Sequence, residues 1–404
     1  MFDTYRPAWA EIDLDAIRYN AGILSQLVAP ASLCAVVKAD GYGHGAPSVA
    51  KAALAGGAIG LAVALVGEGI ELREHGISSP TLLLSEPCGQ GVEAAVAAGL
   101  TPTIYTSEGI AQFAKAARRL GRKVAVHLKV DTGMHRVGAF PEDVLNLVTM
   151  ILEEPNLEFE GLWTHLSVAG GSSNEDVEFT RIQLQRFDRV VEILRDANVR
   201  PKVLHVANSA GAITLPEARY GLVRCGIALY GQSPSLEVTK SLELAQGSGI
   251  VSGSLRPALS LRAKVSALRE LNAGERPSYG RRRALPQRST VATVPIGYAD
   301  GVPRALFDAG FKVLIGGKRY PLAGMVTMDQ IMVDCGDNSQ VCIGQEVTLL
   351  GRQGDDEITA SEWAELLGTI SYEVLCGIGP RVPRINYSVT QPAHEVSTAP
   401  PSKL

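Results

Sequence analysis

Short runs rich in β-branched and apolar residues alternate with longer helical patterns over residues 30–231, and this alternation limits the possible folds more than any other feature of the chain. The runs are residues 33–38, 58–63, 81–85, 103–105, 124–130, 159–166, 203–207 and 222–229. Runs of this kind, separated by segments long enough for crossover helices, predict parallel strands in βα units. Eight such units suit a closed, TIM-like (β/α)8 barrel, so an α/β barrel is the expected fold.

A second domain is expected after residue 245, where the pattern changes. The stretch QGSGIVSGSLRP that follows is rich in Gly and Ser, which is typical of a domain junction. Closely spaced strand-like runs with Gly-containing turns then predict a mainly β carboxyl-terminal domain over residues 246–388. The barrel domain is expected over residues 1–245, of which residues 1–10 could pack on the β domain. Residues 389–404, rich in Pro, Ser and Thr, predict a disordered tail.

One barrel helix, expected from residue 107, carries ordinary start and stop signals. Ser107 is the N-cap candidate, apolar residues recur after it at helical spacing, and Gly121 follows as the stop. A longer amphipathic helix is expected over residues 174–198, where its apolar stripe would pack on the barrel exterior.

Charge and composition favour a small molecule as the partner. Lys and Arg number 38 against 42 Asp and Glu, a net charge of −4 that gives no general attraction for nucleic acid or an anionic membrane. The longest uncharged stretch, residues 52–67, is too short to span a bilayer. Acidic residues stand at the amino terminus where a secretory signal would be basic, so a cytoplasmic location is expected. Six scattered cysteines without a CxxC pair predict reduced thiols rather than disulfides or a metal site.

Polar residues stand where the predicted strands end, which is where barrels of this type place their active sites. These residues are Lys38, Lys129, His165, Asn208, Ser209 and Arg224. Lys38 closes an apolar run and precedes a glycine-rich turn. It is either a lysine whose charged end reaches solvent or a desolvated amine able to form a Schiff base with an aldehyde cofactor.

Several ordered motifs resemble the alanine racemase family from about Trp9 to Tyr387. They are VVKADGYGHG (36–45), HLKVDTGMHRVG (127–138), ANSAGA (207–212), VRCGIALYG (223–231), SYG (278–280), VPIGYADG (294–301), TMDQ (327–330), SYEV (371–374) and RVPRI (381–385). The resemblance implies an isomerase that uses pyridoxal 5'-phosphate to interconvert L-alanine and D-alanine, which in bacteria would supply peptidoglycan synthesis. It also implies a homodimer whose active sites are shared between subunits.

Two bases follow from the resemblance. Lys38 matches the lysine that holds the cofactor as an aldimine and acts on one face of Cα. Tyr279 matches the tyrosine that acts on the opposite face, from the other subunit. Racemisation requires a proton to leave one face and another to arrive on the other, which suits two bases. Without the resemblance, a lone Tyr in a Gly-flanked loop would be read as structural.

The cofactor's ring and phosphate have matching residues. Arg224 resembles the arginine that faces the pyridine nitrogen, where a guanidinium can only donate a proton; the alternative is a rim arginine paired with a carboxylate. His165 matches a histidine near the ring, or is a buried structural histidine. The phosphate partners implied are Ser209 with the amides of Gly226 and Ile227, together with Tyr42, Tyr372 and the neighbouring Asn208.

The substrate end is implied in the same way. Arg136 matches the residue that contacts the substrate carboxylate, and Lys129 matches a lysine that can be carbamylated, which would hold Arg136 rather than repel it. Met328 and Asp329 match the substrate end, and Tyr298 with Tyr372 matches the pair at the entrance. Two departures stand out. Met325 replaces an arginine found in many relatives, and Arg281, Arg282 and Arg283 follow SYG as either a solvated loop or a steering patch.

Two other classes of barrel protein that bind the same cofactor fit this sequence less well. Barrel-type decarboxylases of basic amino acids would be expected to carry a carboxylate at the pyridine nitrogen, where this chain has Arg224. Single-barrel pyridoxal phosphate carriers lack a β domain. Among racemases, a broader specificity that includes serine remains the alternative, because a methylene or hydroxyl changes discrimination by only about 1–3 kcal/mol.

Overall fold

The computed structural model describes residues 5–388, which form two compact units. The barrel unit is Ala16–Arg256, and the β unit combines residues 5–15 with residues 257–388. The sequence placed the division at residue 245, which lies inside helix α10 (Leu236–Gly247), whereas the chain stays with the barrel unit until Arg256. The tail expected over residues 389–404 lies outside the described residues.

The barrel unit contains eight parallel strands, one within or overlapping each expected run. They are β2 (Ser32–Val36), β3 (Gly60–Val63), β4 (Thr81–Leu83), β5 (Thr103–Ile104), β6 (Val124–Lys129), β7 (Leu157–Trp163), β8 (Val203–His205) and β9 (Leu222–Cys225). Their hydrogen-bonded order is β4-β3-β2-β9 in one half and β5-β6-β7-β8 in the other.

Backbone hydrogen bonds at two seams join these halves into a closed barrel. Beside β4, Thr101 accepts from the Leu83 amide and donates to Thr81, both at 2.9 Å. Beside β9, the Arg224 amide donates to the Ala207 carbonyl at 3.0 Å. Because both seams are bonded, the carboxyl ends of all eight strands share one rim.

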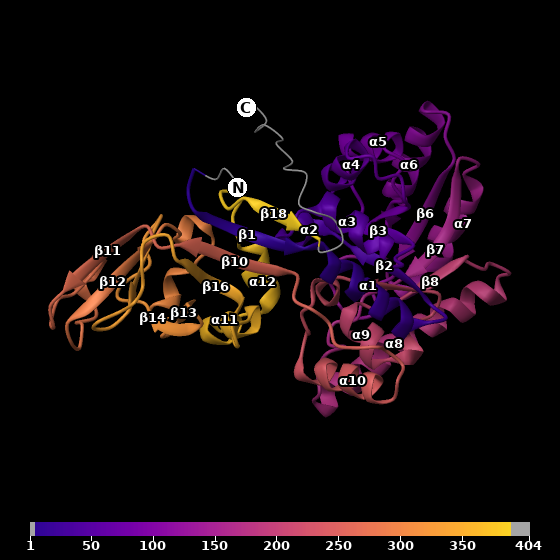
Figure 1. Cartoon of the computed structure of the whole chain (residues 1–404). Helices are drawn as coiled ribbons and strands as arrows, with labels where there is room; N and C mark the ends of the chain where they lie inside the picture. The colour runs from indigo at the N-terminus through magenta and orange to yellow at the C-terminus, as the bar shows by residue number, and fades with distance from the viewer. Residues whose placement is uncertain (1–4, 389–404) are drawn as a thin grey trace. The chain divides into compact units, whose positions relative to one another are not determined.

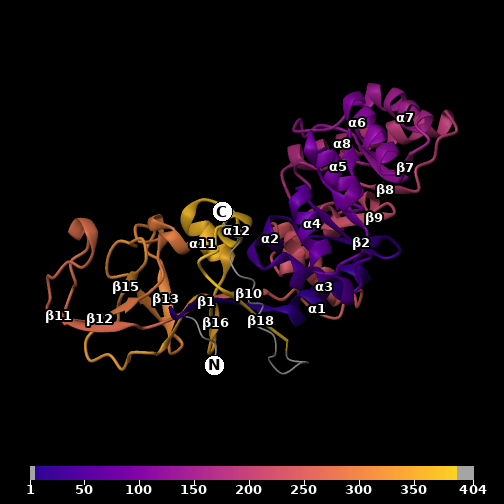
Figure 2. The same ribbon diagram turned by 90° about the horizontal axis from the view of Figure 1, so that it is seen from above.

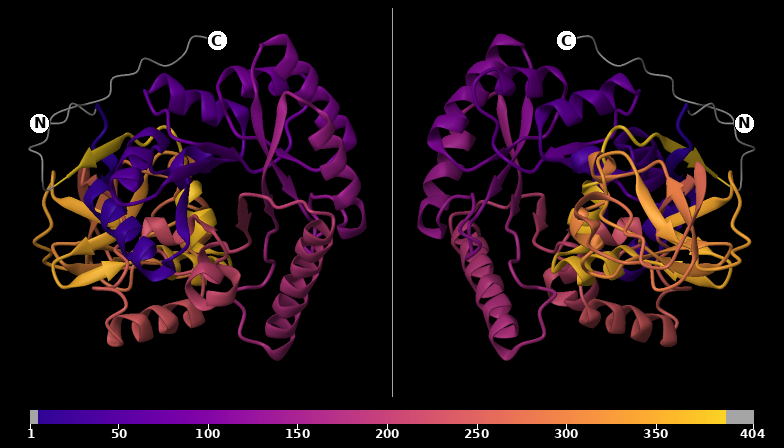
Figure 3. Two further views of the ribbon diagram at one scale, coloured as in Figure 1. Left: turned by 90° about the vertical axis from the view of Figure 1, so that its right-hand side faces the viewer. Right: turned by 90° about the vertical axis from the view of Figure 1, so that its left-hand side faces the viewer.

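Helices connect and cover the strands. They are α1 (Leu14–Val28), which leads in from the β unit, α2 (Lys38–Gly43), α3 (Ala46–Ala55), α4 (Val66–Glu74), α5 (Gln90–Ala97), α6 (Ser107–Arg119), α7 (Val144–Glu153), α8 (Asn174–Asp196), α9 (Ser209–Thr214) and α10. Helices α4, α5 and α6 lie side by side (Figures 1 and 2). The 23-residue α8, the longest, stands out in Figure 3 and buries Phe187, Val190 and Leu194. Within residues 5–388, no helix has the length and apolar character needed to cross a membrane.

The last barrel strand is shorter than its sequence run. β9 ends at Cys225 rather than continuing to residue 229, because Gly226 turns the chain with φ −103° and ψ −97°. Residues Ile227–Tyr230 then form a 3-10 helix whose side chains are all buried. Apolar character over 222–229 therefore reports burial rather than a continuous strand.

The β unit is built on a sheet ordered β14-β13-β16-β10-β1-β18, with β17 paired to β16, and a smaller sheet ordered β11-β12-β15. The strands are β1 (Ala8–Asp13), β10 (Leu259–Lys264), β11 (Ala267–Leu271), β12 (Ser289–Val294), β13 (Lys312–Ile315), β14 (Lys318–Pro321), β15 (Ile331–Asp334), β16 (Glu346–Gln353), β17 (Asp356–Ile358) and β18 (Arg384–Tyr387). Two helices, α11 (Ala360–Leu367) and α12 (Ser371–Cys376), complete it. Trp363 of α11 is fully buried and packs edge-on against Phe311, 5.2 Å between ring centroids.

The amino-terminal strand belongs to the β unit. β1 pairs antiparallel with β10 and parallel with β18, so it is an interior strand of the larger sheet, next to the edge strand β18. Its alternating burial leaves Ala8, Ala10 and Ile12 in the core. The chain therefore enters the β unit first, crosses the whole barrel, and returns.

The N-cap of α6 is Thr106 rather than the expected Ser107. Thr106 has extended backbone angles, and its hydroxyl oxygen accepts from the Gly109 amide at 2.9 Å. That hydroxyl also donates to Glu86, whose carboxylate accepts from the amides of Tyr105 and Thr106. Thr106 and Ser107 are adjacent and both residue types are common N-caps, so the sequence alone could not distinguish them.

This difference gives a paired test. Thr106→Ala should lower stability by about 1 kcal/mol because an orphan amide of the first turn loses its acceptor. Ser107→Ala should change stability little, since Ser107 is the first residue of the helix and its exposed side chain does not provide the cap. Thermal unfolding of both variants measures the difference, and equal losses would contradict the assignment of the cap.

Candidate functional site

Cationic side chains converge at the carboxyl-terminal rim of the barrel strands. Lys38 follows β2, Lys129 ends β6, and Arg224 lies in β9. Burial first, and then the positive charges of Arg224, Lys129, Arg136 and Lys38, hold the pKa of His165 well below its usual value. The rim is therefore a positively charged site that contains a neutral histidine, which suits an anionic ligand.

Two of these cations rest on one indole. The Nζ of Lys129 lies 4.5 Å from the Trp163 ring centroid, and the guanidinium carbon of Arg224 lies 4.4 Å from it. Trp163 is 1% exposed and donates from Nε1 to the Thr103 hydroxyl at 3.1 Å, which fixes its plane. The ring gives both cations an attractive surface in a place where water is excluded.

Lys129 is a strongly perturbed lysine of the rim. Burial first, then the charges of Arg136 and Arg224, lower its pKa to about 7. Its side chain is almost fully buried at 3% exposure. A lysine in this state is partly a neutral amine at physiological pH, and a neutral amine is nucleophilic.

Lys38 stands at the start of a left-handed turn. The next four residues, 39–42, have φ between 51° and 60°, a region that L-residues other than glycine rarely enter. The turn is held by side chains: Asp40 accepts from the Ala46 amide at 2.8 Å, and Glu68 accepts from the Ala39 amide at 2.6 Å. Strain maintained in this way is characteristic of functional sites.

The same turn brings Tyr42 against two other predicted residues. A Cβ on Gly226 would lie 2.3 Å from the Tyr42 hydroxyl oxygen, so only glycine fits there. The Ser209 hydroxyl oxygen accepts from the Gly226 amide at 2.9 Å, and the fully buried Ile227 follows. Tyr42, Ser209 and Gly226 thus form one small polar cradle, defined here as the Tyr42 cradle.

Arg224 is buried and held from several sides. It donates to the Thr164 carbonyl at 2.9 Å and the Val206 carbonyl at 3.1 Å, and it bonds His165 Nδ1 at 3.2 Å and His205 Nδ1 at 3.0 Å. Burial lowers its pKa to about 10, so the guanidinium remains charged at neutral pH. These contacts differ from the expected alternative of a rim arginine paired with a carboxylate.

Asn208 has a structural task. Its Oδ1 accepts from the Gly211 amide at 3.1 Å as the N-cap of α9, and its Nδ2 donates to the Leu166 carbonyl at 3.3 Å. The residue supports the loop that carries Ser209.

The predicted residues of the β unit fall into neighbouring loops. The amides of Tyr298 and Ala299 donate to the carbonyls of Thr327 and Met328, both at 3.0 Å, which sets Tyr298 beside Met328. Both side chains are exposed, at 44% and 52%. This pairing depends on Gly297, where a Cβ would lie 2.3 Å from the Thr327 carbonyl oxygen. Tyr372 lies on α12 of the same unit.

A buried aspartate that the sequence analysis missed holds these loops. Asp300 is fully buried, pairs with Arg6 at 2.8 Å and Arg381 at 3.4 Å, and accepts from the Gly297 amide at 2.9 Å. Arg381 also pairs with Asp329 at 2.7 Å. Asp329 is therefore an ion-pair partner inside the β unit. Nothing in the local sequence GYADG indicates this role of Asp300, because its partner Arg6 is far away in the sequence.

Tyr279 sits on a strained and exposed loop. It is 73% exposed, and its neighbours Ser278 and Arg281 have φ of 70° and 47°. The Ser278 hydroxyl donates to the carbonyl of the buried Met325 at 2.7 Å. The backbone of Met325 thus anchors the loop.

The arginine triplet divides between structural and exposed roles. Arg283 pairs with Asp334 at 2.9 Å and donates to the Leu322 carbonyl, and Arg282 pairs with Asp308 at 3.0 Å. Two of the three arginines are thus tied to the β unit itself.

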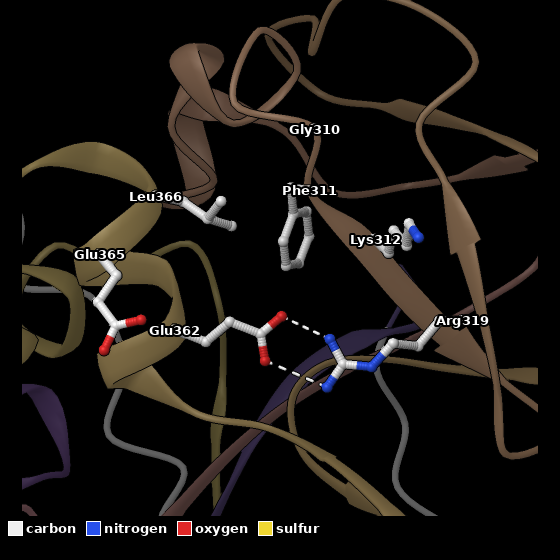
Figure 4. A pocket seen from close by; sticks show the side chains of 7 residues that line it. All are labelled: Gly310, Phe311, Lys312, Arg319, Glu362, Glu365 and Leu366. Carbon is white, nitrogen blue, oxygen red and sulfur yellow. Dashed lines mark hydrogen bonds and ion pairs between the residues drawn. The ribbon is translucent and has the colours of Figure 1, made fainter.

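A hollow of about 400 Å³ in the β unit lies apart from all the predicted residues (Figure 4). Arg319 and Glu362 face each other across it, and Arg319 also bonds Asp356 at 2.7 Å. Because its guanidinium already has two carboxylate partners, this hollow is better explained as an ion-pair cluster than as a ligand site.

Fold and site together define a two-domain barrel enzyme with a cation-rich site at the carboxyl ends of its strands. Family models described as the N-terminal and C-terminal domains of alanine racemase match residues 12–234 and 258–386. This chain belongs to the alanine racemase family.

Individual relatives agree with that membership. An alanine racemase of Symbiobacterium thermophilum is 45% identical over 95% of this chain and 97% of its own. The solved alanine racemase of Bacillus anthracis with bound L-Ala-P matches at a TM-score of 0.86 and 35% identity, covering 96% of this chain and 97% of that one. A histidine racemase of Leuconostoc mesenteroides subsp. sake matches at a TM-score of 0.83 and 30% identity, covering 95% and 99%.

The lowered pKa of Lys129 predicts a pH-dependent stability. Between about pH 7 and 10.5 the unfolded chain binds more protons at this lysine than the folded chain. Its destabilising effect is therefore complete below pH 7 and shrinks as the pH rises toward 10.5. Lys129→Met should stabilise the ligand-free protein by a few kcal/mol, on the order expected for a shift of this size, near pH 6–7, and by less near pH 10.

Thermal unfolding across this pH range measures the effect. Lys51→Met, on the exposed side of α3, is the matched control and should change stability little at any pH. A gain for Lys129→Met that stays constant with pH would contradict the assignment.

Proposed function

We propose that this protein is an alanine racemase that uses pyridoxal 5'-phosphate to interconvert L-alanine and D-alanine. The observation that carries the proposal is Lys38 on its strained turn at the rim of a barrel of this family. The amine stands among cations that favour an anionic cofactor and the carboxylate of an amino acid substrate. The proposed role in the cell is supply of D-alanine for peptidoglycan, in the cytoplasm, where thiols such as the buried Cys34 and Cys225 stay reduced.

The residues present fit the chemical parts of this cofactor. The Tyr42 cradle brings the hydroxyl groups of Tyr42 and Ser209 together at Gly226, whose missing side chain leaves room for the Tyr42 hydroxyl, and two such hydroxyl groups suit a phosphate. Ile227 would add a backbone amide, and Tyr372 a phenol from the β unit. Lys38 would hold the aldehyde carbon. When bound, pyridoxal phosphate would delocalise the electron pair that remains after the Cα proton departs.

Arg224 would face the pyridine nitrogen, with His165 beside the ring. A guanidinium donates a hydrogen bond and cannot take up a proton, so it would leave the ring nitrogen unprotonated. An arginine at this position would therefore limit electron withdrawal by the ring and would favour return of a proton to Cα over transamination. The carbonyl partners of Arg224 support this role because they hold the guanidinium charged and in place.

Two bases would move the protons. Lys38 would hold or remove the proton on one face of Cα, and Tyr279 would do so on the other. The exposure of Tyr279 within one chain supports an arrangement in which a second subunit covers it. We therefore propose a homodimer whose active sites are shared.

Arg136 would bind the substrate carboxylate. The lowered pKa of Lys129 supports its carbamylation, because the neutral amine can attack carbon dioxide, release one proton and become an anion. That anion would attract Arg136 where an ammonium would repel it. Tyr298 with Tyr372 would narrow the entrance, and Met328 with Asp329 would border the substrate, which favours a small amino acid such as alanine.

The first test concerns Lys38. Borohydride reduction of the holoenzyme, followed by peptide mapping, should find the pyridoxyl group on Lys38, because this amine stands at the strained turn beside the cation cluster. Lys38→Ala should lose racemase activity and the label, whereas Lys51→Ala should keep both. A pyridoxyl group on another lysine of the wild-type protein would overturn the central assignment.

The second test separates the two faces of Cα. Tyr279→Phe should lose racemisation, while Lys38 still exchanges the Cα proton of D-alanine, taking it as the D-side base as in the family. Incubation with each enantiomer in heavy water, read by mass spectrometry, should show deuterium in D-alanine and little in L-alanine.

Tyr387→Phe is the matched control, since it removes an exposed phenol of the same unit that has no part in the proposed site, and it should exchange both enantiomers. Equal exchange by Tyr279→Phe, or retained racemisation, would remove Tyr279 from the role of opposing base.

A further inference from the structure

A hydrogen-bonded chain leads from Arg224 through the barrel interior to a partly exposed carboxylate. Arg224 Nη1 lies 3.0 Å from His205 Nδ1, His205 Nε2 lies 2.8 Å from His127 Nδ1, and His127 Nε2 lies 3.2 Å from Glu160 Oε2. Both histidines are buried, at 0% and 6% exposure. The side chain of Glu160 is 33% exposed.

The guanidinium at one end and the carboxylate at the other favour the same direction for every bond in this chain. Arg224 can only donate, so His205 Nδ1 must accept and its proton must be on Nε2. His205 then donates to His127 Nδ1, which leaves the His127 proton on Nε2, pointing at Glu160. The carboxylate can only accept, which is what this arrangement requires. The pKa of His205 is held well below its usual value, chiefly by burial, which agrees with a neutral ring.

The backbone of β7 is shaped for this chain. Val126 pairs with Phe159 but the next residue, His127, pairs with Gly161, so Glu160 is an extra residue in a β-bulge. Bulges re-aim side chains, and this one turns Glu160 toward His127. A Cβ on Gly161 would lie 2.5 Å from His127 Nδ1, so the imidazole fits only because this residue is glycine.

The opposite direction would harm Arg224. If His127 carried its proton on Nδ1, it would donate to His205 Nε2 and move the His205 proton to Nδ1. That N–H would then face the N–H of Arg224, and the buried guanidinium would lose an acceptor. The Glu160 carboxylate accepts from His127 Nε2, and this favours the arrangement in which His205 Nδ1 accepts from Arg224.

We propose that Glu160 and His127 are positioning residues for catalysis: through His205 they fix the histidine tautomers that hold Arg224 in place. The inference rests on the proposed function for the task of Arg224 at the cofactor ring. The chain itself rests on the geometry of the barrel interior. Trp163, stacked on His205 at 11° between planes, holds that ring parallel to the indole.

The test replaces the terminal carboxylate. Glu160→Leu removes the acceptor, and Glu160→Gln keeps an oxygen that can accept from His127. Glu158→Leu is the matched control, because Glu158 lies on the same strand and contacts Lys202 and Lys123 instead of the histidines. Thermal unfolding checks that each variant is folded.

Nitrogen-15 spectra of the histidine-labelled holoenzyme read the tautomers directly. The wild type, Glu160→Gln and Glu158→Leu should show His127 and His205 protonated at Nε2. Glu160→Leu should show both rings shifting toward protonation at Nδ1. Unchanged tautomers in Glu160→Leu would overturn the proposal, whatever the activity.

Racemisation kinetics supply the second measurement. Glu160→Leu should lower kcat on the order of tenfold, as when an outer hydrogen-bond partner of a ligating group is lost, with little change in KM. Glu160→Gln should recover most of that loss, and Glu158→Leu should match the wild type. An unchanged kcat in Glu160→Leu, or an equal loss in Glu158→Leu, would also overturn the proposal. A wild type without racemase activity would count against the proposed function, while the spectra would still test the chain.

Discussion

A buried guanidinium needs acceptors for its N–H groups, and Arg224 places that demand at the centre of the barrel rim. Two of its acceptors are the carbonyls of Thr164 and Val206, which come directly after β7 and β8 where the strand ladder ends. The others are nitrogens of His165 and His205, whose pKa values are held well below the usual value first by burial and then by the charge of Arg224. Burial first, and then the charges of Arg136 and Arg224, lower the pKa of Lys129 at the same rim. The carbonyl groups and neutral histidines around Arg224 are thus arranged as its hydrogen-bond acceptors.

The sequence predicted the barrel well because parallel strands buried on both faces leave continuous apolar runs. It also predicted the rim residues, because polar side chains at the ends of such runs are conspicuous. Lys38, Lys129, His165 and Arg224 do meet, as their mutual effects on pKa values require. The roles predicted for the site residues of the β unit, including Tyr279, rest on the motif resemblance and remain predictions.

Other features could not be read from the pattern. Glu158 and Glu160 both alternate with apolar neighbours and are equally exposed, and only the bulge distinguishes the glutamate that pairs with Lys202 from the one aimed at a histidine. His127 stands two residues before Lys129, so strand periodicity places both side chains on the same face. Periodicity does not show that the hydrogen-bond partners of His127 come from β7 and β8. The tasks of Asp300 and the strand pairing of β1 depend on segments hundreds of residues apart, for which local periodicity carries no information.

The position of β1 has a consequence for the order in which the chain can fold. Its partners, β10 and β18, begin at Leu259 and Arg384, so the ribosome must make the whole barrel before either exists. All eight barrel strands lie between Ser32 and Cys225, and they can close as soon as that stretch has emerged. Contacts so distant in sequence form slowly, and domains generally fold as units during synthesis. β1 is thus synthesised before the barrel strands but can pair with its neighbours only after all of them have been made.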